Sequence, residues 1–106
     1  MICTLFKVQP SPIHGRGMFA GVDLLPGLMV PIVAAEVDEE HCTRKTIEVV
    51  GTYWEPYHPF AFINHSDNPN AEIFWCEDSD CLFLHILKVI EAEHEITVDY
   101  EAEGDI

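Results

Sequence analysis

Basic residues are scarce in this chain of 106 residues, which has 5 lysines and arginines, 19 aspartates and glutamates, and a formal net charge of −14. Direct binding to nucleic acid requires clusters of Lys and Arg that neutralise phosphates. The composition therefore argues against a nucleic-acid partner and against polyphosphate cofactors. It favours a basic partner, especially for the acidic stretch 91–105, although acidity that only keeps a small protein in solution explains the charge equally well.

Long apolar runs are also lacking. The longest uncharged apolar stretch, Leu24 to Ala35, is too short to cross a membrane and is interrupted by Pro26, Gly27 and Pro31. The first residues lack the charged start, apolar middle and small-residue cleavage site of a secretory signal. We therefore expect no membrane contact and a cytoplasmic protein, or one inside a host cell if the source is viral.

Cysteines are few and show no metal-binding pattern. The chain has Cys3, Cys42, Cys76 and Cys81, with no Cys-x-x-Cys pair. Zinc sites normally require such a pair, and His58 and His65 lack the His-x-x-x-His spacing of a helical metal site. Because nothing indicates an oxidising compartment, we expect free thiols and no bound metal.

The apolar fraction of 48% is enough for one domain with one core, spanning residues 1–106. Alternating patterns and frequent proline and glycine predict a mostly β fold with little helix. Strands are expected at 2–8, 18–20, 28–35, 71–76, 81–87 and 95–100, and the clearest hairpin joins 71–76 to 81–87 through the acidic turn 77–80.

One region is ambiguous between helix and strand. Glu36 to Val50 could form a helix capped by Asp38 or Thr43, because Val37, His41, Ile47 and Val50 could line one face. Thr46 to Val50 is equally compatible with a strand.

Two segments, 63–70 and 95–100, place the polar residues Asn64, His65, Asp99 and Tyr100 beside apolar strand-like runs, where unsatisfied polar groups cost about 1–3 kcal/mol each. A third motif precedes them. Gly15-Arg16-Gly17 would let the backbone approach a ligand, although a simple turn explains two glycines more often. Asn64 could recognise an amine or an adenine edge, but His65 alone is more often structural, and residues 66–70 also fit an Asx turn. A hydrolase triad is unlikely because His65, Ser66 and Asp67 are consecutive.

Taken together, these motifs resemble the SET-domain protein lysine methyltransferases. The matching segments are 11–20, then Phe62-Ile63-Asn64-His65-Ser66 with Pro69-Asn70, then Glu95-Ile96-Thr97-Val98-Asp99-Tyr100, in the family's order. The chain is similar to a minimal, stand-alone SET domain of viral or bacterial type. The resemblance implies several small β-sheets around a pseudoknot-like core, in which the Asn64 segment and the Tyr100 end are threaded together.

The resemblance also implies a cofactor and a site. S-adenosylmethionine would bind Gly15, Arg16 and Gly17 together with Asn64 and His65. Arg16 and Gly17 would contact it through backbone groups, and Asn64 and His65 would hold its amino-acid end and its adenine. Tyr100 would contact the cofactor and act as the catalytic residue beside the transferred methyl group.

The substrate channel is less clearly implied. Tyr53, Tyr57 and Asp99 are candidates for its lining, because an aromatic wall accepts an alkylammonium group well. Core packing is the better interpretation of Trp54.

The chain also departs from the family pattern. Asp67 stands where many SET enzymes have a zinc-binding cysteine, and no cysteine follows Tyr100, so neither a pre-SET segment nor a zinc-binding post-SET segment is expected. A homodimer or the substrate itself could then close the channel. The family's Gly-Glu-Glu is Glu93-His94-Glu95 in this chain.

The expected function is S-adenosylmethionine-dependent methylation of a lysine in a basic, for example histone-like, protein. Methyl transfer is an in-line displacement that needs positioning and electrostatics, without a metal or a covalent intermediate. The alternative is a catalytically weak SET-fold module whose acidic surface binds a basic partner, and a third hypothesis is an acidic mimic that competes with nucleic acid for basic proteins.

Overall fold

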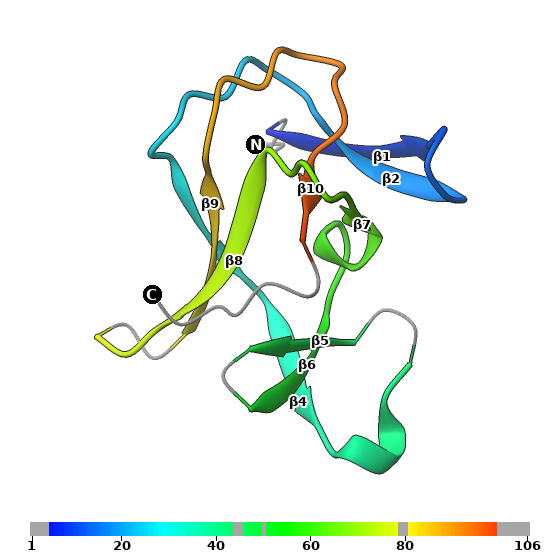
Figure 1. Ribbon diagram of the computed structural model, residues 1–106, viewed down its shortest axis with the longest axis vertical. Helices are drawn as coiled ribbons and strands as arrows, with labels where there is room; N and C mark the ends of the chain where they lie inside the picture. The colour runs from blue at the N-terminus through cyan, green and yellow to red at the C-terminus, as the bar shows by residue number, and fades with distance from the viewer. Residues whose placement is uncertain (1–4, 44–45, 50, 79–80, 100–106) are drawn as a thin grey trace.

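The fold consists of short strands, as expected. The computed structural model describes residues 5–43, 46–49, 51–78 and 81–99. The strands are β1 (Phe6–Pro10), β2 (Arg16–Ala20), β3 (Met29–Ile32), β4 (Ala34–Val37), β5 (Ile47–Val49), β6 (Thr52–Pro56), β7 (Asn64–His65), β8 (Ala71–Cys76), β9 (Cys81–Ile86) and β10 (Thr97–Val98), with 3-10 helices η1 (Glu39–His41) and η2 (Phe60–Phe62) (Figure 1). The prediction of a mostly β fold built from several small sheets is confirmed.

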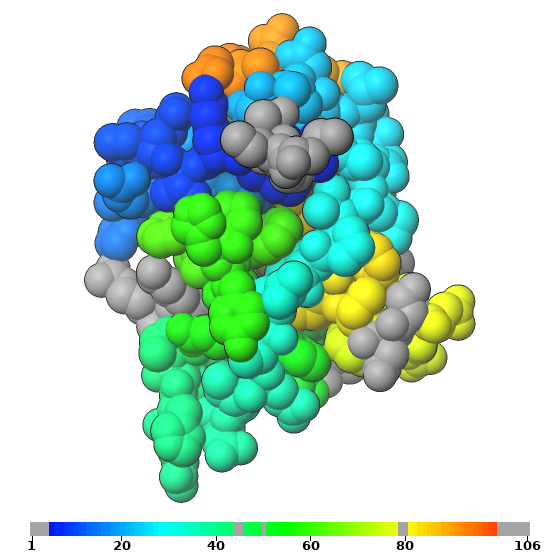
Figure 2. Space-filling model, turned by 180° about the vertical axis from the view of Figure 1, so that it is seen from behind, coloured from blue at the N-terminus to red at the C-terminus, as the bar shows by residue number. Residues whose placement is uncertain are grey.

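The strands form four small sheets: β1-β2, β3-β9-β8, β4-β6-β5 and the parallel pair β10-β7. Their arrangement brings distant segments together. In Figure 1, β7 and β10 lie between the β1-β2 ribbon and the β4-β6-β5 sheet. In Figure 2, the green segment around η2 lies against the blue N-terminal ribbon, where Phe6 and Phe60 pack edge to face with ring centroids 5.7 Å apart.

The hairpin predicted at 71–76 and 81–87 is confirmed as β8 and β9, with Cys76 opposite Cys81. Cys42, Cys76 and Cys81 are unbridged, which confirms the expectation of free thiols for these three, while Cys3 lies outside the described residues. Within the described ranges, no helix has the length and apolar character needed to span a membrane.

Two predicted strands have different limits in the structure. The strand expected at 2–8 is β1, which continues through Pro10; an edge strand tolerates proline because its outward side needs no N–H donor. The single strand expected at 28–35 is split at Val33 into β3 and β4, which join different sheets. The chain leaves one sheet for the next here, so a continuous apolar run does not imply one strand.

The helix considered for Glu36 to Val50 is wrong, and the strand alternative is right. β4 extends to Val37, η1 is a single 3-10 turn, and Ile47 and Val49 are buried in β5 with exposed Glu48 between them. Asp38 precedes η1 without a side-chain capping bond. Burial with period two, filled by β-branched residues, outweighs a weak helical pattern.

The core is apolar and lies between the sheets. Its largest fully buried side chains are Met18, Leu24, Leu84, Ile86, Ile90 and Ile96. Ile96, Thr97 and Val98 are all buried, so the last described strand runs through the interior. The strand predicted at 95–100 is therefore shorter, and Glu95 forms only an isolated bridge with Phe19.

Glu93, which occupies the family's glycine position, adopts a left-handed backbone conformation with φ 74°. It lies in a tight turn in which the His94 N–H donates to the Glu91 carbonyl at 3.1 Å, and its side chain pairs with Lys7. A residue with a Cβ is strained there.

We expect Glu93→Gly to raise the free energy of unfolding by about 0.5–1 kcal/mol, because relief of backbone strain exceeds the loss of a surface ion pair. Urea unfolding followed by circular dichroism measures the change. Glu93→Gln is the control, since it keeps the strain and loses the charge, and it should be slightly less stable than the wild type. A glycine variant no more stable than the glutamine variant would contradict the strain argument.

Candidate functional site

The loop that carries Gly15-Arg16-Gly17 is anchored by a side chain from far along the chain. The Ser11 N–H donates to the Gly15 carbonyl at 2.8 Å, and Gly15 has a positive φ of 45°. The Asn64 Nδ2 group lies 3.1 Å from the His14 carbonyl oxygen and 3.2 Å from that of Arg16. Asn64 therefore determines where the glycine loop lies.

Glu95 is the second anchor of the same loop. Its carboxylate accepts hydrogen bonds from Asn64 Nδ2 at 2.8 Å and from Ser11 Oγ at 2.8 and 2.9 Å. Gly17 is packed so closely that a Cβ there would lie 2.2 Å from Glu95 Oε2. Sequence reasoning did not assign a role to Ser11 or Glu95. The available signal was a carboxylate directly before the apolar strand residues Ile96 to Val98, where charge is costly unless hydrogen-bonded.

The segments that carry Asn64 and Asp99 run side by side. β7 pairs in parallel with β10, with Asn64 opposite Thr97 and His65 opposite Val98. The Ser66 N–H donates to the Val98 carbonyl at 3.0 Å. The resemblance implied that these segments are threaded together; the structure shows them paired side by side, and the Tyr100 end lies outside the described residues.

Asn70 holds this pair of segments together. Its Nδ2 donates to the Glu95 carbonyl at 2.9 Å, and its Oδ1 accepts from the Thr97 N–H at 2.9 Å. The sequence left two interpretations of Asn70 open, an Asx turn and part of the family motif. Its side-chain hydrogen bonds are tertiary, because they join it to Glu95 and Thr97.

His65 lies between two carboxylates at the end of β7. Its Nε2 is 3.0 Å from Asp67 Oδ1, and its Nδ1 is 3.6 Å from Asp99 Oδ1. The His65 and Asp99 side chains are 34% and 33% exposed, so both are reachable from solvent. Tyr100, the catalytic residue implied by the resemblance, lies outside the described residues.

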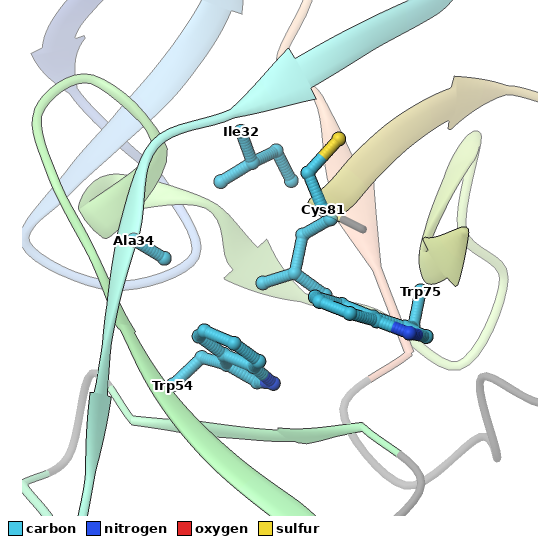
Figure 3. Close-up of a pocket in the computed structure, with 6 residues that line it drawn as sticks. Ile32, Ala34, Trp54, Trp75 and Cys81 are labelled. Atoms are coloured by element: carbon cyan, nitrogen blue, oxygen red, sulfur yellow. The ribbon is translucent and has the colours of Figure 1, made fainter. Parts of the chain in front are cut away.

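A small, partly open cavity of about 110 Å³ lies between two sheets and is lined by Ile32, Ala34, Trp54, Trp75, Cys81 and Leu82. Figure 3 shows Ile32, Ala34, Trp54 and Trp75 around the opening. The two indoles are stacked, with ring centroids 5.3 Å apart and planes 19° apart. β10 packs against β8, the strand that carries Trp75.

The tyrosines predicted for the channel do not line this cavity. Tyr53 neighbours Trp54 on β6, and alternation along a strand directs it to the opposite face. The nearby carboxylate of Glu48, followed by that of Glu39, raises the pKa of the Tyr53 hydroxyl above its usual value. Tyr57 is 52% exposed. Trp54 packs against the core, as expected, and also forms part of the cavity wall.

Gly17→Ala tests whether the glycine loop needs its close contact with Glu95. We expect binding of S-adenosylmethionine, the cofactor implied by the resemblance, to weaken at least about tenfold and the free energy of unfolding to fall by about 1–3 kcal/mol, because the new methyl group displaces the Glu95 carboxylate. Titration calorimetry and urea unfolding measure the two effects. Gly27→Ala, with φ 97° and open space around its Cβ position, is the control. Gly27→Ala should lower the free energy of unfolding without weakening cofactor binding. An equal loss of binding in both variants would contradict a local effect of the methyl group at position 17.

Comparison with known proteins supports this description. The SET domain family model matches residues 15–101. A crystal structure of a candidate histone methyltransferase from Plasmodium falciparum superposes with a TM-score of 0.74 at 19% sequence identity, covering 93% of this chain and 95% of that one. A search of curated proteins found no significant match.

Proposed function

The chain belongs to the SET-domain family, whose enzymes are protein lysine methyltransferases, and from this membership we propose that it methylates lysine in a basic protein with S-adenosylmethionine as the donor. The observation that carries the proposal is the convergence of three motifs. Asn64 hydrogen-bonds the Gly15-Arg16-Gly17 loop and Glu95, while β7 pairs with the strand that ends before Asp99. Segments distant in the sequence thus meet at one place.

The residues at this place suit a cationic cofactor. S-adenosylmethionine carries a sulfonium and an ammonium group, and the Asp67 and Asp99 carboxylates beside His65 would attract positive charge. Gly15, Arg16 and Gly17 would hold it through backbone groups, with Asn64 and His65 on its other side. When bound, the cofactor supplies an activated methyl group.

The chain's own contribution is positioning. The cavity beside the stacked Trp54 and Trp75 offers an apolar wall for the alkyl stem of a lysine, and aromatic faces attract its ammonium group. Tyr100, one residue beyond Asp99, would orient the amine with its hydroxyl group. Partial desolvation beside the two indoles and the positive charge of the sulfonium would lower the pKa of the lysine, so that its amine could lose the proton.

The substrate class follows from charge. A protein with a net charge of −14 attracts basic proteins, and the structurally similar Plasmodium protein is described as a candidate histone methyltransferase. We propose a lysine-rich, for example histone-like, substrate, met in the cytoplasm or inside a host cell.

The test combines binding and transfer. We expect titration calorimetry to show binding of S-adenosylmethionine, and incubation with the labelled cofactor and core histones or cell lysate to yield methylated lysines identified by mass spectrometry. Absence of cofactor binding would favour the alternative, an acidic SET-fold module that holds a basic partner without catalysis.

We also propose a homodimer in which a second copy closes the substrate channel. Size-exclusion chromatography with light scattering measures the molar mass directly. A monomer at micromolar concentration would leave closure of the channel to the substrate.

A further inference from the structure

The outer face of the β3-β9-β8 sheet is unusually apolar for a surface that is partly exposed. Strand alternation and the register place two rows of side chains on it: Met29, His85 and Glu72 in one row, and Pro31, Phe83 and Phe74 in the next. The opposite side chains of β9, Leu82, Leu84 and Ile86, are buried in the core. We call these six side chains the outer face.

The polar members of the outer face are already paired with each other. His85 Nδ1 lies 2.8 Å from Glu72 Oε2, and both side chains are 31% exposed. The apolar members are arranged as a platform: Phe74 and Phe83 stack with centroids 5.9 Å apart, and Phe74 packs edge to face on His85 at 6.2 Å. Met29 beside them is 46% exposed, and Pro31 is also exposed.

Such a face requires an explanation. The solvated side of an antiparallel sheet normally carries polar residues in alternation with the core-facing ones. A contiguous apolar patch on a soluble protein typically marks an interaction site. The outer face is distinct from the Trp54–Trp75 cavity, because Trp75 alternates with Phe74 along β8 and points to the other side of the sheet.

The charge beside the outer face indicates which kind of molecule binds there. Glu77 and Asp78 are exposed where β8 ends, and this end of the hairpin projects from the body of the molecule (Figure 1). A second copy docked on this face would bring its own Glu77 and Asp78 to the same edge, and this local repulsion disfavours self-association at the outer face. The chain's residues 101–106 include Glu101, Glu103 and Asp105, so their charge does not complement this edge either.

We propose that the outer face is a docking surface for a basic segment of the protein substrate, away from the lysine that is methylated. An apolar or aromatic side chain of that segment packs on Phe74 and Phe83, where an arginine can also stack. Lysines or arginines next to it meet Glu77 and Asp78. This inference rests on the proposed function for its partner, a basic protein, but the surface itself is tested without catalysis.

The binding test uses purified core histones as basic proteins with apolar side chains and poly-lysine as a basic chain without them. Binding is measured by titration calorimetry without cofactor. We expect Phe83→Thr to weaken histone binding about tenfold and to leave poly-lysine binding unchanged. Glu77→Lys combined with Asp78→Lys should weaken both, and because these residues are exposed, this variant keeps the fold. Leu25→Thr, which removes a 65% exposed apolar side chain elsewhere, is the control and should change neither affinity.

The kinetic test separates this surface from the active site. With intact histones, Phe83→Thr should raise KM about tenfold at constant kcat; with a short lysine peptide, neither constant should change. Unchanged histone binding in both the Phe83 and the Glu77/Asp78 variants would overturn the docking surface while leaving methyl transfer intact. Methyl transfer could fail for every substrate while Phe83→Thr still weakens histone binding. This result would contradict the proposed function and support the docking surface. If the wild type has the molar mass of a dimer and Phe83→Thr that of a monomer, the outer face binds a second copy of the chain. This result would overturn the proposal.

Discussion

Replacement of Asn64 by aspartate is expected to lower the free energy of unfolding by about 3 kcal/mol at pH 7, which is a large part of a small domain's stability. Asparagine and aspartate have nearly the same shape, so the expected loss of stability is electrostatic. Asn64 Nδ2 lies 2.8 Å from Glu95 Oε2 and donates toward the carbonyl oxygens of His14 and Arg16. An aspartate carboxylate has no donor to offer and would place a second negative charge against Glu95.

The pH dependence of this variant has a definite sign. Repulsion by Glu95 raises the pKa of the new carboxyl group in the folded state above its unfolded value of about 3.9. The variant's stability is therefore best at low pH and is lost as pH rises through the folded-state pKa. Urea unfolding at pH 7 and pH 5 should show part of the deficit disappearing at the lower pH.

Asn68→Asp is the matched control for this experiment. Asn68 is exposed, and its Oδ1 already accepts from Lys88 Nζ at 3.3 Å, so a carboxylate there gains an ion pair. Its stability should change by less than about 0.5 kcal/mol. Equal losses in the two variants would show that Asn64 does not anchor the glycine loop through its amide donor.

The second large effect is expected in catalysis. Tyr100→Phe should reduce the rate of methyl transfer by about 10²- to 10³-fold, as expected for loss of one positioned hydrogen-bonding group in an active site. Cofactor binding and stability should change little, because the substitution removes a single hydroxyl group. Single-turnover transfer of a labelled methyl group measures the rate, and calorimetry with S-adenosylmethionine measures binding.

Tyr57→Phe serves as the control for the tyrosine experiment. Tyr57 is 52% exposed and does not line the described cavity, so its hydroxyl group should be dispensable. Full activity in Tyr100→Phe would remove this residue from the mechanism. Loss of activity in Tyr57→Phe would instead support the tyrosine wall expected from the sequence.

Local patterns were sufficient for the parts of the fold that depend on neighbouring residues. The β8-β9 hairpin was predictable because alternating apolar residues flank an acidic turn, and both signals lie within one short stretch. The secondary structure of region 36–50 was not predictable, because its helical and strand patterns are of similar strength. Pairing with β6, which buries Ile47 and Val49, makes β5 a strand.

The sequence by itself determined the family, through three motifs whose order and residue types are visible along the chain, and it determined the acidic net charge. Only the tertiary structure showed that Glu95 and Ser11 hold Asn64, that Asn70 clamps the last strand, and that Trp54 meets Trp75. The reason is physical: these contacts join residues far apart in the chain, and no local pattern encodes which distant partner satisfies a polar group or completes an aromatic pair.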